Sequence, residues 1–421
     1  MTSDRAITRV RGLAGDFWRF WVGQTISNLG SSFTLFALPL LVFKLTGSPL
    51  NLGLITAFEF LPYLLFGLIL GAWVDRVDRR RMMILTDIVQ ALVISSIPLL
   101  AALDLLSVWW IYAVGFVSST LKICFDAGEF AAIPSLVGTD DLIKANGLIQ
   151  ASYSAALFFG PLMAGALLAV VPIQTVLLFD ALSFLASALM LALVRSSFNT
   201  TGGGEETLTS LRQDVVEGLR YVLSHPILRN ISIMMALINF LAATTQTQLV
   251  LFAKERFGAS DAQVGFLYSA GALGIVVLSM AAGPVRERVS FSKAALGGLM
   301  VYGLLITGLA FTGRFWLALP VWALACGFGI FFNINTSSLR QAIVPNQLLG
   351  RIMSIAAVLA WSAIPLGSLL GGLAIEWTQN VALVYGTIGL LVFLVAVSFS
   401  FTALGRAEYY LVQEKGTEAT N

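Results

Sequence analysis

The sequence predicts an all-α membrane protein whose twelve transmembrane helices form two pseudo-symmetric six-helix bundles. The first observation behind this prediction is composition: 57% of the 421 residues are hydrophobic and 11% are charged. A soluble domain carries about 25% charged residues, so most of this chain must face lipid or other apolar helices. The second observation is a series of long apolar segments, and the third is an internal repeat. The composition alone excludes a water-soluble multidomain enzyme.

Twelve apolar segments are long enough to cross a bilayer, because about 20 residues at about 1.5 Å per residue span a hydrocarbon core of roughly 30 Å. The first half of the chain has six such segments, at residues 18–43, 51–73, 82–103, 108–130, 146–170 and 176–194. The second half has the other six, at residues 228–250, 263–284, 292–312, 316–338, 352–375 and 381–403. We expect one bundle from residues 1–194 and the other from residues 228–403.

Residues 195–227 separate the two predicted bundles and form the longest polar stretch of the chain. The run Gly202-Gly203-Gly204 is typical of a flexible linker. Apolar residues then recur at helical spacing with charged residues between them: Leu208, Leu211, Val215, Leu219 and Val222. This pattern predicts an amphipathic helix at the membrane interface. We expect a cytoplasmic linker here and a cytoplasmic tail at residues 404–421.

The distribution of lysine and arginine predicts the orientation. With the N-terminus inside, most basic residues fall in cytoplasmic segments, including four arginines between positions 76 and 81. The opposite loops hold only Lys44, Lys254, Arg256 and Arg314. Cytoplasmic loops carry an excess of these residues, so we expect both termini in the cytoplasm and a multi-pass protein of the cell (plasma or inner) membrane. The polar first sixteen residues and the long first apolar segment predict no cleavable signal peptide.

A basic turn joins the second and third predicted spans, with the sequence Gly-Ala-Trp-Val-Asp-Arg-Val-Asp-Arg-Arg-Arg at residues 71–81. Its arginines must lie in water, and its glycine lets two helices approach closely. Its aspartate can pair with an arginine or cap a neighbouring helix end. Asp87 lies near the inner end of the third span. We expect Asp87 to hold the arginine loop or a facing helix end as part of a gate.

Three features of the first half recur in the same order in the second half. The Gly160–Gly165 stretch of the fifth span, with Pro161, is matched by residues 364–372 of the eleventh. Pro134 after the fourth span is matched by Pro345 after the tenth, and the basic turn is matched by residues 283–288. Chance recurrence of glycine and proline in apolar sequence is the alternative. A duplicated six-span unit predicts a binding site between the halves, near the bilayer midplane.

The chain resembles the major facilitator superfamily over essentially its full length. The superfamily's loop motif, G-x-L-a-D-r-x-G-r-[KR]-[KR], is matched by Gly71, Asp75, Arg76, Arg79 and Arg80. Trp73 replaces the leucine of that motif, and Asp78 replaces its second glycine. The resemblance implies two six-helix bundles and alternating access. It also implies that Asp75 helps to lock the outward-facing state through contacts between helices.

More narrowly, the chain is similar to the exporter branch that includes enterobactin and macrolide efflux carriers. The matching runs are Trp21–Gln24, Ser27–Gly30, Leu61–Tyr63, Leu178–Phe184 and Val344–Ser354. The stretch with Gly160, Pro161 and Gly165 resembles the fifth-span motif of drug/proton antiporters, in which the glycines and the proline bend and tighten the helix. The resemblance favours a monomeric efflux carrier of small drug-like or siderophore-like compounds.

Two groups of ionisable residues within the spans are candidates for proton coupling, because such residues are costly in a membrane and default to functional roles. Glu59 is expected about 12 Å below the outer edge of the second span; a carboxyl paired with a neighbouring helix is the alternative. Lys122, Asp126 and Glu129 share one face of the fourth span. An ion pair of Lys122 and Asp126 that only lowers the cost of burial is the alternative there. Asp180, in the sixth span, fits a structural role better.

Candidate substrate contacts follow from the resemblance, because the first, fourth, seventh and tenth spans line the cavity in this superfamily. In this chain the first, seventh and tenth of these spans offer amides and aromatic rings: Gln24, Asn28, Phe33, Phe36, Asn239, Phe240, Gln246, Gln248, Phe332, Asn333 and Asn335. Amides with aromatic rings suit a large amphipathic ligand. The alternative is that these polar residues hydrogen-bond across helices for packing.

No cofactor or metal site is expected. The sequence has no Gly-x-x-x-x-Gly-Lys-[ST] loop for ATP hydrolysis. Its single histidine, His225, is insufficient for a metal site, and Cys124 and Cys326 fall in apolar segments as small core residues. Membrane anchoring and contact with anionic lipid explain the basic loops better than nucleic acid does.

We therefore predict a secondary active transporter, not an enzyme, that uses protons to export small amphipathic compounds. Protonation of Glu59, or of Asp126 and Glu129, would bias one state, and substrate would bind the other. An importer or uniporter remains open, because topology does not set the direction of transport. A membrane-embedded enzyme would need its reactive groups at one depth, whereas the charges here lie at different depths. A structural or receptor-like protein has no need of polar residues in repeat-related helices.

Overall fold

The computed structural model describes residues 15–74, 77–137, 141–198, 216, 218–344 and 346–407. Twelve helices in these ranges are long and apolar enough to cross a membrane, which confirms the predicted number of spans. The described residues contain no β-strand. Of the predicted linker, only residues 195–198, 216 and 218–227 are described, and 218–224 are helical. Leu208, Leu211, Val215 and the tail beyond residue 407 lie outside the described residues.

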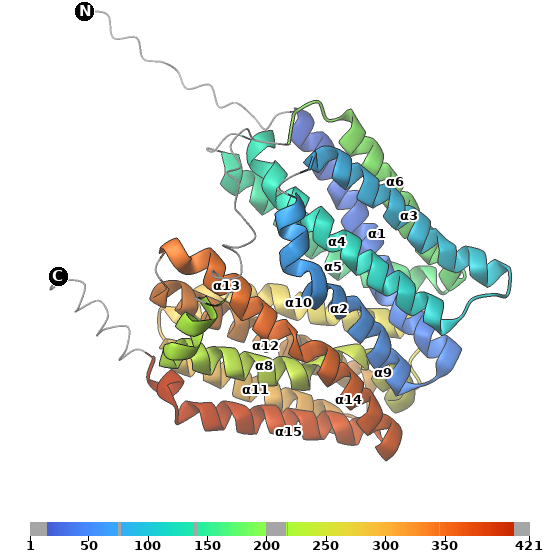
Figure 1. Ribbon diagram of the computed structural model, residues 1–421. Helices are drawn as coiled ribbons and strands as arrows, with labels where there is room; N and C mark the ends of the chain where they lie inside the picture. Colours follow the sequence, from blue (N-terminus) through green and yellow to red (C-terminus); the bar gives the residue numbers. More distant parts are fainter. Residues whose placement is uncertain are drawn as a thin grey trace, which may run out of the picture.

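The helices form two bundles (Figure 1). The first bundle consists of α1 (Gly15–Thr46), α2 (Pro49–Val74), α3 (Arg79–Ala102), α4 (Val108–Leu136), α5 (Leu142–Leu167) and α6 (Ile173–Leu193). The second consists of α8 (Pro226–Thr247), α9 (Leu249–Phe257), α10 (Asp261–Arg286), α11 (Phe291–Phe311), α12 (Phe315–Ile343), α13 (Asn346–Trp361), α14 (Ala363–Thr378) and α15 (Val381–Ser400), followed by the short 3₁₀ helix η2 (Ala403–Arg406). Within the first bundle α1 packs on α5 and α6, and within the second α10 packs on α12 and α11 on α15.

Residues at the helix ends explain where several spans begin and stop. Ser107 precedes α4, and its hydroxyl accepts a hydrogen bond from the Trp110 backbone. Ser260 begins α10 with a reciprocal capping box to Gln263. Gly258 ends α9 in the left-handed conformation, at φ +60°, which glycine adopts without steric cost. These caps satisfy backbone groups that a helix terminus otherwise leaves unpaired.

The eleventh span differs from the continuous segment that the sequence predicts. It is divided into α13 and α14 around Ser362. Pro365 has no backbone N–H to donate to the Trp361 carbonyl, four residues earlier, and this loss weakens the helix at the division. The seventh span differs as well, since it ends at Thr247 and α9 follows as a separate short helix.

The two bundles contact each other through two equivalent pairs of helices, α2 with α14 and α5 with α10. A Cβ added to Gly53 of α2 would lie 2.5 Å from the Ser368 carbonyl oxygen of α14. A Cβ added to Gly265 of α10 would lie 2.5 Å from the Pro161 carbonyl oxygen of α5. At both places the helices therefore approach backbone to backbone, as small residues allow in membranes.

These contacts lie at one end of the bundles, where α1, α5 and α14 end and α2 and α10 begin. We call it the closed end, and we call the opposite end, where α3 begins with Arg79–Arg81, the basic end. In Figure 1 the bundles meet near α9 and diverge toward the start of α13. Polar contacts also join the two bundles at the closed end. Lys44 of α1 pairs with Asp261 of α10 at 2.5 Å, and the Gln248 amide donates to the Pro49 carbonyl at 2.7 Å.

The repeat is visible in how the fifth and eleventh spans pack. Gly160 of α5 lies against Ser32 of α1, so that no side chain fits between them. Gly367 and Gly371 of α14 lie in the same way against Phe240 and Thr244 of α8. Each of these spans thus packs closely on the first helix of its own bundle. Each also reaches across to the other bundle, which gives the molecule its pseudo-two-fold arrangement.

Candidate functional site

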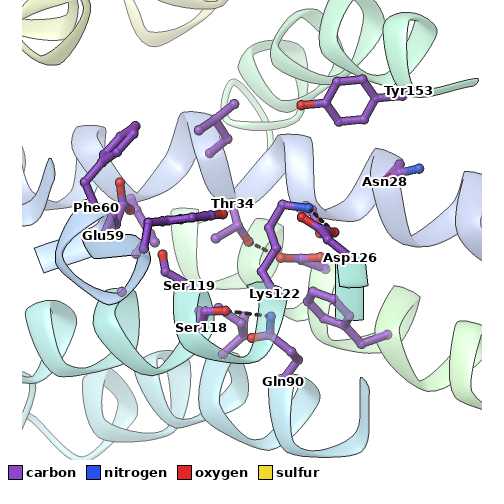
Figure 2. Close-up of a pocket in the computed structure, with 18 of the residues that line it drawn as sticks. Asn28, Thr34, Glu59, Phe60, Gln90, Ser118, Ser119, Lys122, Asp126 and Tyr153 are labelled. Atoms are coloured by element: carbon purple, nitrogen blue, oxygen red, sulfur yellow. Dashed lines mark hydrogen bonds and ion pairs between the residues drawn. The ribbon is translucent and has the colours of Figure 1, made fainter. Parts of the chain in front are cut away.

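A cavity of about 740 Å³ lies within the first bundle and is completed by Trp361 and Ile364 of the second bundle. Its wall combines charged, hydroxyl, amide and aromatic side chains from α1–α6. Figure 2 shows these side chains converging, with Glu59 beside Phe60 and apart from the pair formed by Lys122 and Asp126. The volume falls in the range that holds a drug-sized ligand.

Glu59 occupies the cavity wall on α2. The backbone of α4 approaches it closely because α4 has a glycine there: a Cβ added to Gly115 would lie 3.3 Å from Glu59 Cγ. Within the described ranges Glu59 has neither a hydrogen bond nor an ion pair. The alternative considered from the sequence, a carboxyl satisfied by a neighbouring helix, therefore finds no partner among the described residues.

The predicted cluster on α4 lines the same cavity. Lys122 Nζ lies 2.9 Å from Asp126 Oδ1, which confirms the predicted ion pair, and both side chains are about half exposed, at 50% and 46%. Glu129 lies one turn nearer the basic end, and its Oε1 atom is buried without a hydrogen bond in the part of the chain that is described. The cavity thus has a neutralised pair and a separate acid on one helix face.

Asp87 is 1% exposed, and its Oδ2 atom is buried without a hydrogen-bond partner among the described residues. Its carboxyl lies beside Ser187 of α6, whose hydroxyl oxygen accepts from the Gln24 amide of α1 at 3.2 Å. Asp87 lies about 12 Å along α3 from Arg79 at the rise of an α-helix. It therefore contacts the middle of α6, and no ion pair joins it to a described arginine. Its role in a gate stays a prediction.

Asp180 is 1% exposed and is held by hydroxyl groups. It accepts a hydrogen bond from Thr34 of α1 and another from Ser183 at 3.2 Å. These bonds satisfy its carboxyl and tie α6 to α1, which agrees with a structural role.

Two arginines of the basic turn bind the end of α6 and the residues that follow it. Arg80 Nε donates to the Leu191 carbonyl at 3.0 Å and its Nη2 donates to Ala192 at 2.5 Å. Arg79 Nη1 donates to the Phe198 carbonyl at 3.2 Å. Cations are favourable at a helix C-terminus, where carbonyls lack helical partners. Arg80 therefore holds the end of α6, and Arg79 holds the start of the linker, in this state.

The rest of the turn is described in part. Gly71 belongs to the last turn of α2, whereas Asp75 and Arg76 lie outside the described residues. Asp78 caps α3, since its carboxylate accepts from the Arg81 backbone at 3.0 Å. This cap gives a physical reason for an aspartate where the superfamily motif has its second glycine.

The amide and aromatic candidates of the first span divide between the cavity and the packing between helices. Asn28 lines the cavity. Gln24 does not, because its amide is used by Ser187. Phe36 does not either, since it is fully buried with its ring 5.5 Å from that of Tyr268 in α10.

The candidates of the second bundle do not line this cavity. Asn239 donates to the Ala360 carbonyl at 2.9 Å, and Asn335 donates to Phe331 at 2.8 Å. Gln246 lies 3.8 Å from the Cys326 sulfur, and Asn333 is exposed elsewhere. The amides of Asn239, Gln246 and Asn335 therefore make contacts within the second bundle in this state, as the packing alternative expects. Their contact with substrate stays a prediction.

Several cavity residues were missed from the sequence. Tyr63, Gln90, Ser118, Tyr153 and Trp361 all line the wall. Gln90 Nε2 donates to the Ser118 carbonyl at 3.1 Å, while Gln90 Oε1 and the Ser118 hydroxyl are buried without a partner among the described residues. Their polar atoms within apolar spans were the available signal. Tyr63, Gln90, Tyr153 and Trp361 lie outside the first, fourth, seventh and tenth spans to which the resemblance points, and a serine such as Ser118 is common in helices.

The fifth-span motif serves close packing on two sides. Gly160 lies against Ser32 of α1, and Gly165 and Pro161 lie against α10 of the other bundle. The helix continues through Pro161 from Leu142 to Leu167. The motif therefore tightens the contacts of α5 without dividing the helix.

Sequence relatives include efflux proteins. A family model described as a transmembrane secretion effector matches residues 13–410. Macrolide efflux protein A of Streptococcus pyogenes is 24% identical over 363 residues, which are 85% of this chain and 88% of that protein. The multidrug efflux pump Tap of Mycolicibacterium fortuitum is 26% identical over 358 residues, 82% of this chain and 86% of that protein.

Solved structures of transporters share the fold. The nucleoside transporter NupG, as a D323A mutant, has a TM-score of 0.76 at 13% identity and covers 93% of this chain and 99% of its own. A bacterial homologue of the iron transporter ferroportin, in an inward-facing state, has a TM-score of 0.74 at 17% identity and covers 93% of this chain and 100% of its own. These identities establish the fold alone.

The family and the fold are those of multi-pass membrane transporters of small molecules rather than of enzymes. The resemblance inferred from the loop motif and the matching runs is thereby confirmed. The chain belongs to the transmembrane secretion effector family of the major facilitator superfamily.

Proposed function

We propose that this transporter is a proton-coupled exporter of small amphipathic compounds, drug-like or siderophore-like, that works by alternating access. The observation that carries the proposal is the carboxyl of Glu59, which has no partner among the described residues and lies in the wall of a drug-sized cavity. The printed names of two relatives, a macrolide efflux protein and a multidrug efflux pump, support export rather than import.

The arginine distribution supports placing the basic end, and both termini, in the cytoplasm. The closed end then faces the outside, and the structure corresponds to an inward-facing state. The described contacts between α2 and α14 and between α5 and α10 close the outer side of the cavity. Substrate would enter from the cytoplasm or from the inner part of the membrane.

The mechanism is a rocking of the body formed by residues 1–194 against the body formed by residues 228–403. The connector 195–227 is long enough in sequence to allow it. At Gly53 and Gly265 the bundles touch through backbone atoms, and small hydroxyl side chains add hydrogen bonds, from Ser368 to the Gly53 carbonyl at 3.2 Å and from Ser269 to the Phe158 carbonyl at 2.8 Å. Contacts made by backbone and small side chains separate without forcing bulky side chains into new rotamers, which favours a reversible closure. Lys44 and Asp261 would part at the same time.

Glu59 is suited to couple a proton to this motion, since it lies on α2, one of the helices of the bundle interface. A ligand shifts an equilibrium only by its differential affinity for the two states. Rocking of α2 against α14 changes the surroundings of Glu59, so protonation would favour one state and substrate the other. Asp126 and Glu129 form the second candidate proton site, with Lys122 as the partner that stabilises Asp126.

The test is substrate-triggered proton flux in proteoliposomes, with a panel of dyes, macrolides and siderophores. We expect at least one compound to drive flux in the wild type, and we expect Glu59→Gln to bind it without coupling. Glu376→Gln is the matched control, because Glu376 is exposed at the end of α14, away from the cavity. Normal coupling in Glu59→Gln would transfer the role to Asp126 and Glu129.

The same preparation separates export from its rivals. Uptake that runs with the proton gradient would indicate an importer, and movement of compound without proton flux would indicate a uniporter. If no compound moves protons in a folded sample, proton antiport fails for that panel. Size-exclusion analysis of the same sample tests the expected monomer.

A further inference from the structure

The cavity has an excess of acidic side chains. Four carboxyls line it, from Glu59, Asp126, Glu129 and Asp180, against one amine among the described lining residues, Lys122. The Lys122 amine is bound to Asp126 at 2.9 Å, and Asp180 is satisfied by the Thr34 and Ser183 hydroxyls. Glu59 and Glu129 remain without a described hydrogen-bond partner, and Glu129 Oε1 is buried as well. The electrostatic preference of the cavity is therefore for a cation.

Aromatic side chains stand around the acidic groups. Phe60, Tyr63 and Tyr153 from the first bundle line the cavity together with Trp361 from the second. The rings of Tyr63 and Trp361 meet edge to face across the bundle interface, with centroids 6.0 Å apart. Aromatic faces attract ammonium groups, most strongly where water is excluded. They suit an organic cation better than a small hydrated metal ion.

A second, apolar pocket adjoins the cavity beside Glu59. Its volume is about 230 Å³, and it is lined by α2, α4, α13 and Ser362 between α13 and α14. Phe60, Tyr63 and Trp361 belong to both walls. None of the described residues that line this side pocket is charged. A Cβ added to Gly67, one of its lining residues, would meet no other atom within 4 Å, so the pocket has room for an apolar group.

Resting on the proposed function, we propose that the cavity and the side pocket form one bipartite site for an amphipathic organic cation. The ammonium group lies at the Glu59 carboxylate, and the apolar arm lies in the side pocket between α2 and α13. The positions of the ammonium group and the apolar arm follow from the sequence, because Phe60 directly follows Glu59 and forms part of both walls. An anionic ligand would instead face Glu59 and Glu129 unpaired.

This arrangement also gives the exchange of proton and substrate a physical basis. The Glu59 carboxyl holds either a proton or, once ionised, the ammonium group, so binding of the cation releases the proton from the carboxyl oxygen to water at the open, basic end of the cavity. The apolar arm bridges the two bundles at Tyr63 and Trp361, which makes its binding sensitive to their rocking. A neutral ligand would leave the proton on Glu59 and would not exchange with it.

The test measures binding to the full chain in lipid nanodiscs by calorimetry, with empty nanodiscs subtracted. The probes are 6-phenylhexyltrimethylammonium, the neutral 6-phenylhexanol, and tetramethylammonium, which has the charge without the arm. We expect the phenylhexyl cation to bind the wild type at least about tenfold more tightly than the alcohol. We expect Glu59→Gln to remove this difference without changing the affinity for the alcohol. Equal affinity for cation and alcohol in the wild type would overturn the proposal.

The side pocket is tested by Gly67→Leu, which fills it from the α2 side. We expect this variant to lower the affinity for the phenylhexyl cation by roughly tenfold and to leave the affinity for tetramethylammonium unchanged. Gly308→Leu is the matched control, because Gly308 is exposed on α11 and also has open space at its Cβ position. If Gly67→Leu leaves the affinity for the phenylhexyl cation unchanged, the apolar arm does not occupy the side pocket. The pocket then holds a lipid chain or nothing, and the bipartite site is overturned.

The outcome is separable from that of the proposed function, because calorimetry needs no gradient and no transport. Cation binding without proton flux for any compound would leave the site intact and refute proton coupling. Proton flux driven by a neutral compound, together with no preference for the cation, would support the exporter and refute this inference.

Discussion

The two bundles arise from the same predicted repeat, yet they treat their equivalent positions differently. Counting from Gly71 and its counterpart Gly283, Glu59 of the first bundle corresponds to Gly271 of the second. Counting from Pro134 and Pro345, Gly115 corresponds to Cys326. Glu59 lies against Gly115, and Gly271 lies against Cys326. The large and small partners have exchanged sides, and only the first arrangement carries a charge.

The exchange explains why the cavity is one-sided. At Gly271 a Cβ would lie 2.9 Å from the indole nitrogen of Trp322, so apolar side chains of α12 fill the space that Glu59 faces in the first bundle. Trp322 is 2% exposed. The second bundle therefore gives the cavity only Trp361 and Ile364 among its described residues. A duplicated fold can thus keep the same helix packing in both halves while the charged residues of the cavity come from one half.

The largest expected effect comes from forcing the second bundle to resemble the first. Gly271→Glu would place a carboxylate against Trp322 and Cys326 in a filled interior. Overpacking and an unpaired buried charge together should cost about 3–5 kcal/mol of stability. Thermal unfolding of the purified protein in detergent measures the loss. Gly283→Glu is the control, because Gly283 is exposed near the end of α10 with no atom near its Cβ position. A stable, coupling-competent Gly271→Glu variant would contradict the comparison.

A second prediction concerns the region where the bundles are alike. Gly53 and Gly265 occupy equivalent places, each with 2.5 Å between an added Cβ and a facing carbonyl oxygen. Gly53→Ala and Gly265→Ala should each destabilise the closed end by about 1–3 kcal/mol, because the facing helices must move apart. Spin-label distances across the closed end should lengthen in both variants. An effect in one variant alone would show that the two interfaces are not equivalent.

A third prediction tests the polar contact at the same end. Asp261 receives Lys44 at 2.5 Å from the other bundle and Lys254 at 2.6 Å from its own. These side chains are partly exposed, so each pair is worth only about 0.2–1 kcal/mol. Asp261→Asn should lower the population of the closed arrangement by a few-fold, less than the glycine variants do. Lys254→Ala preserves the pair of Lys44 and Asp261 between the bundles. It should therefore have a smaller effect on the same spin-label distances than Lys44→Ala.

The twelve spans could be predicted from sequence because span length and apolar composition follow directly from the bilayer. Glu59, Lys122, Asp126 and Glu129 could be identified as functional candidates because charged residues are rarely tolerated within a membrane, and the structure shows that all four line the cavity. The amide of Asn239 could not be placed, since hydropathy does not show whether an amide faces a cavity or a carbonyl such as that of Ala360.

The glycines show the same limit. The sequence does not show what faces a glycine in an apolar span. Gly115 leaves space for the Glu59 side chain of the facing helix, whereas Trp322 fills the space beside Gly271. Which of the two occurs depends on the residue of the facing helix. The side pocket could not be predicted from the sequence for a related reason, because it lies where α13 and α14 are divided.

The last and most local expected effect concerns the helix that follows the basic turn in each bundle. Asp78 caps α3 with its carboxylate, whereas Ser290, its counterpart before α11, makes no side-chain cap bond. Asp78→Ala should therefore cost about 0.5–1 kcal/mol, and Ser290→Ala should cost close to nothing. Hydrogen exchange at the first turns of α3 and α11 measures both locally. Equal protection loss in the two variants would mean that the first bundle gains nothing from the aspartate at this position. A loss confined to α3 would mean that the first bundle has replaced the glycine of the superfamily motif with a cap, just as it has placed an acid opposite Gly115.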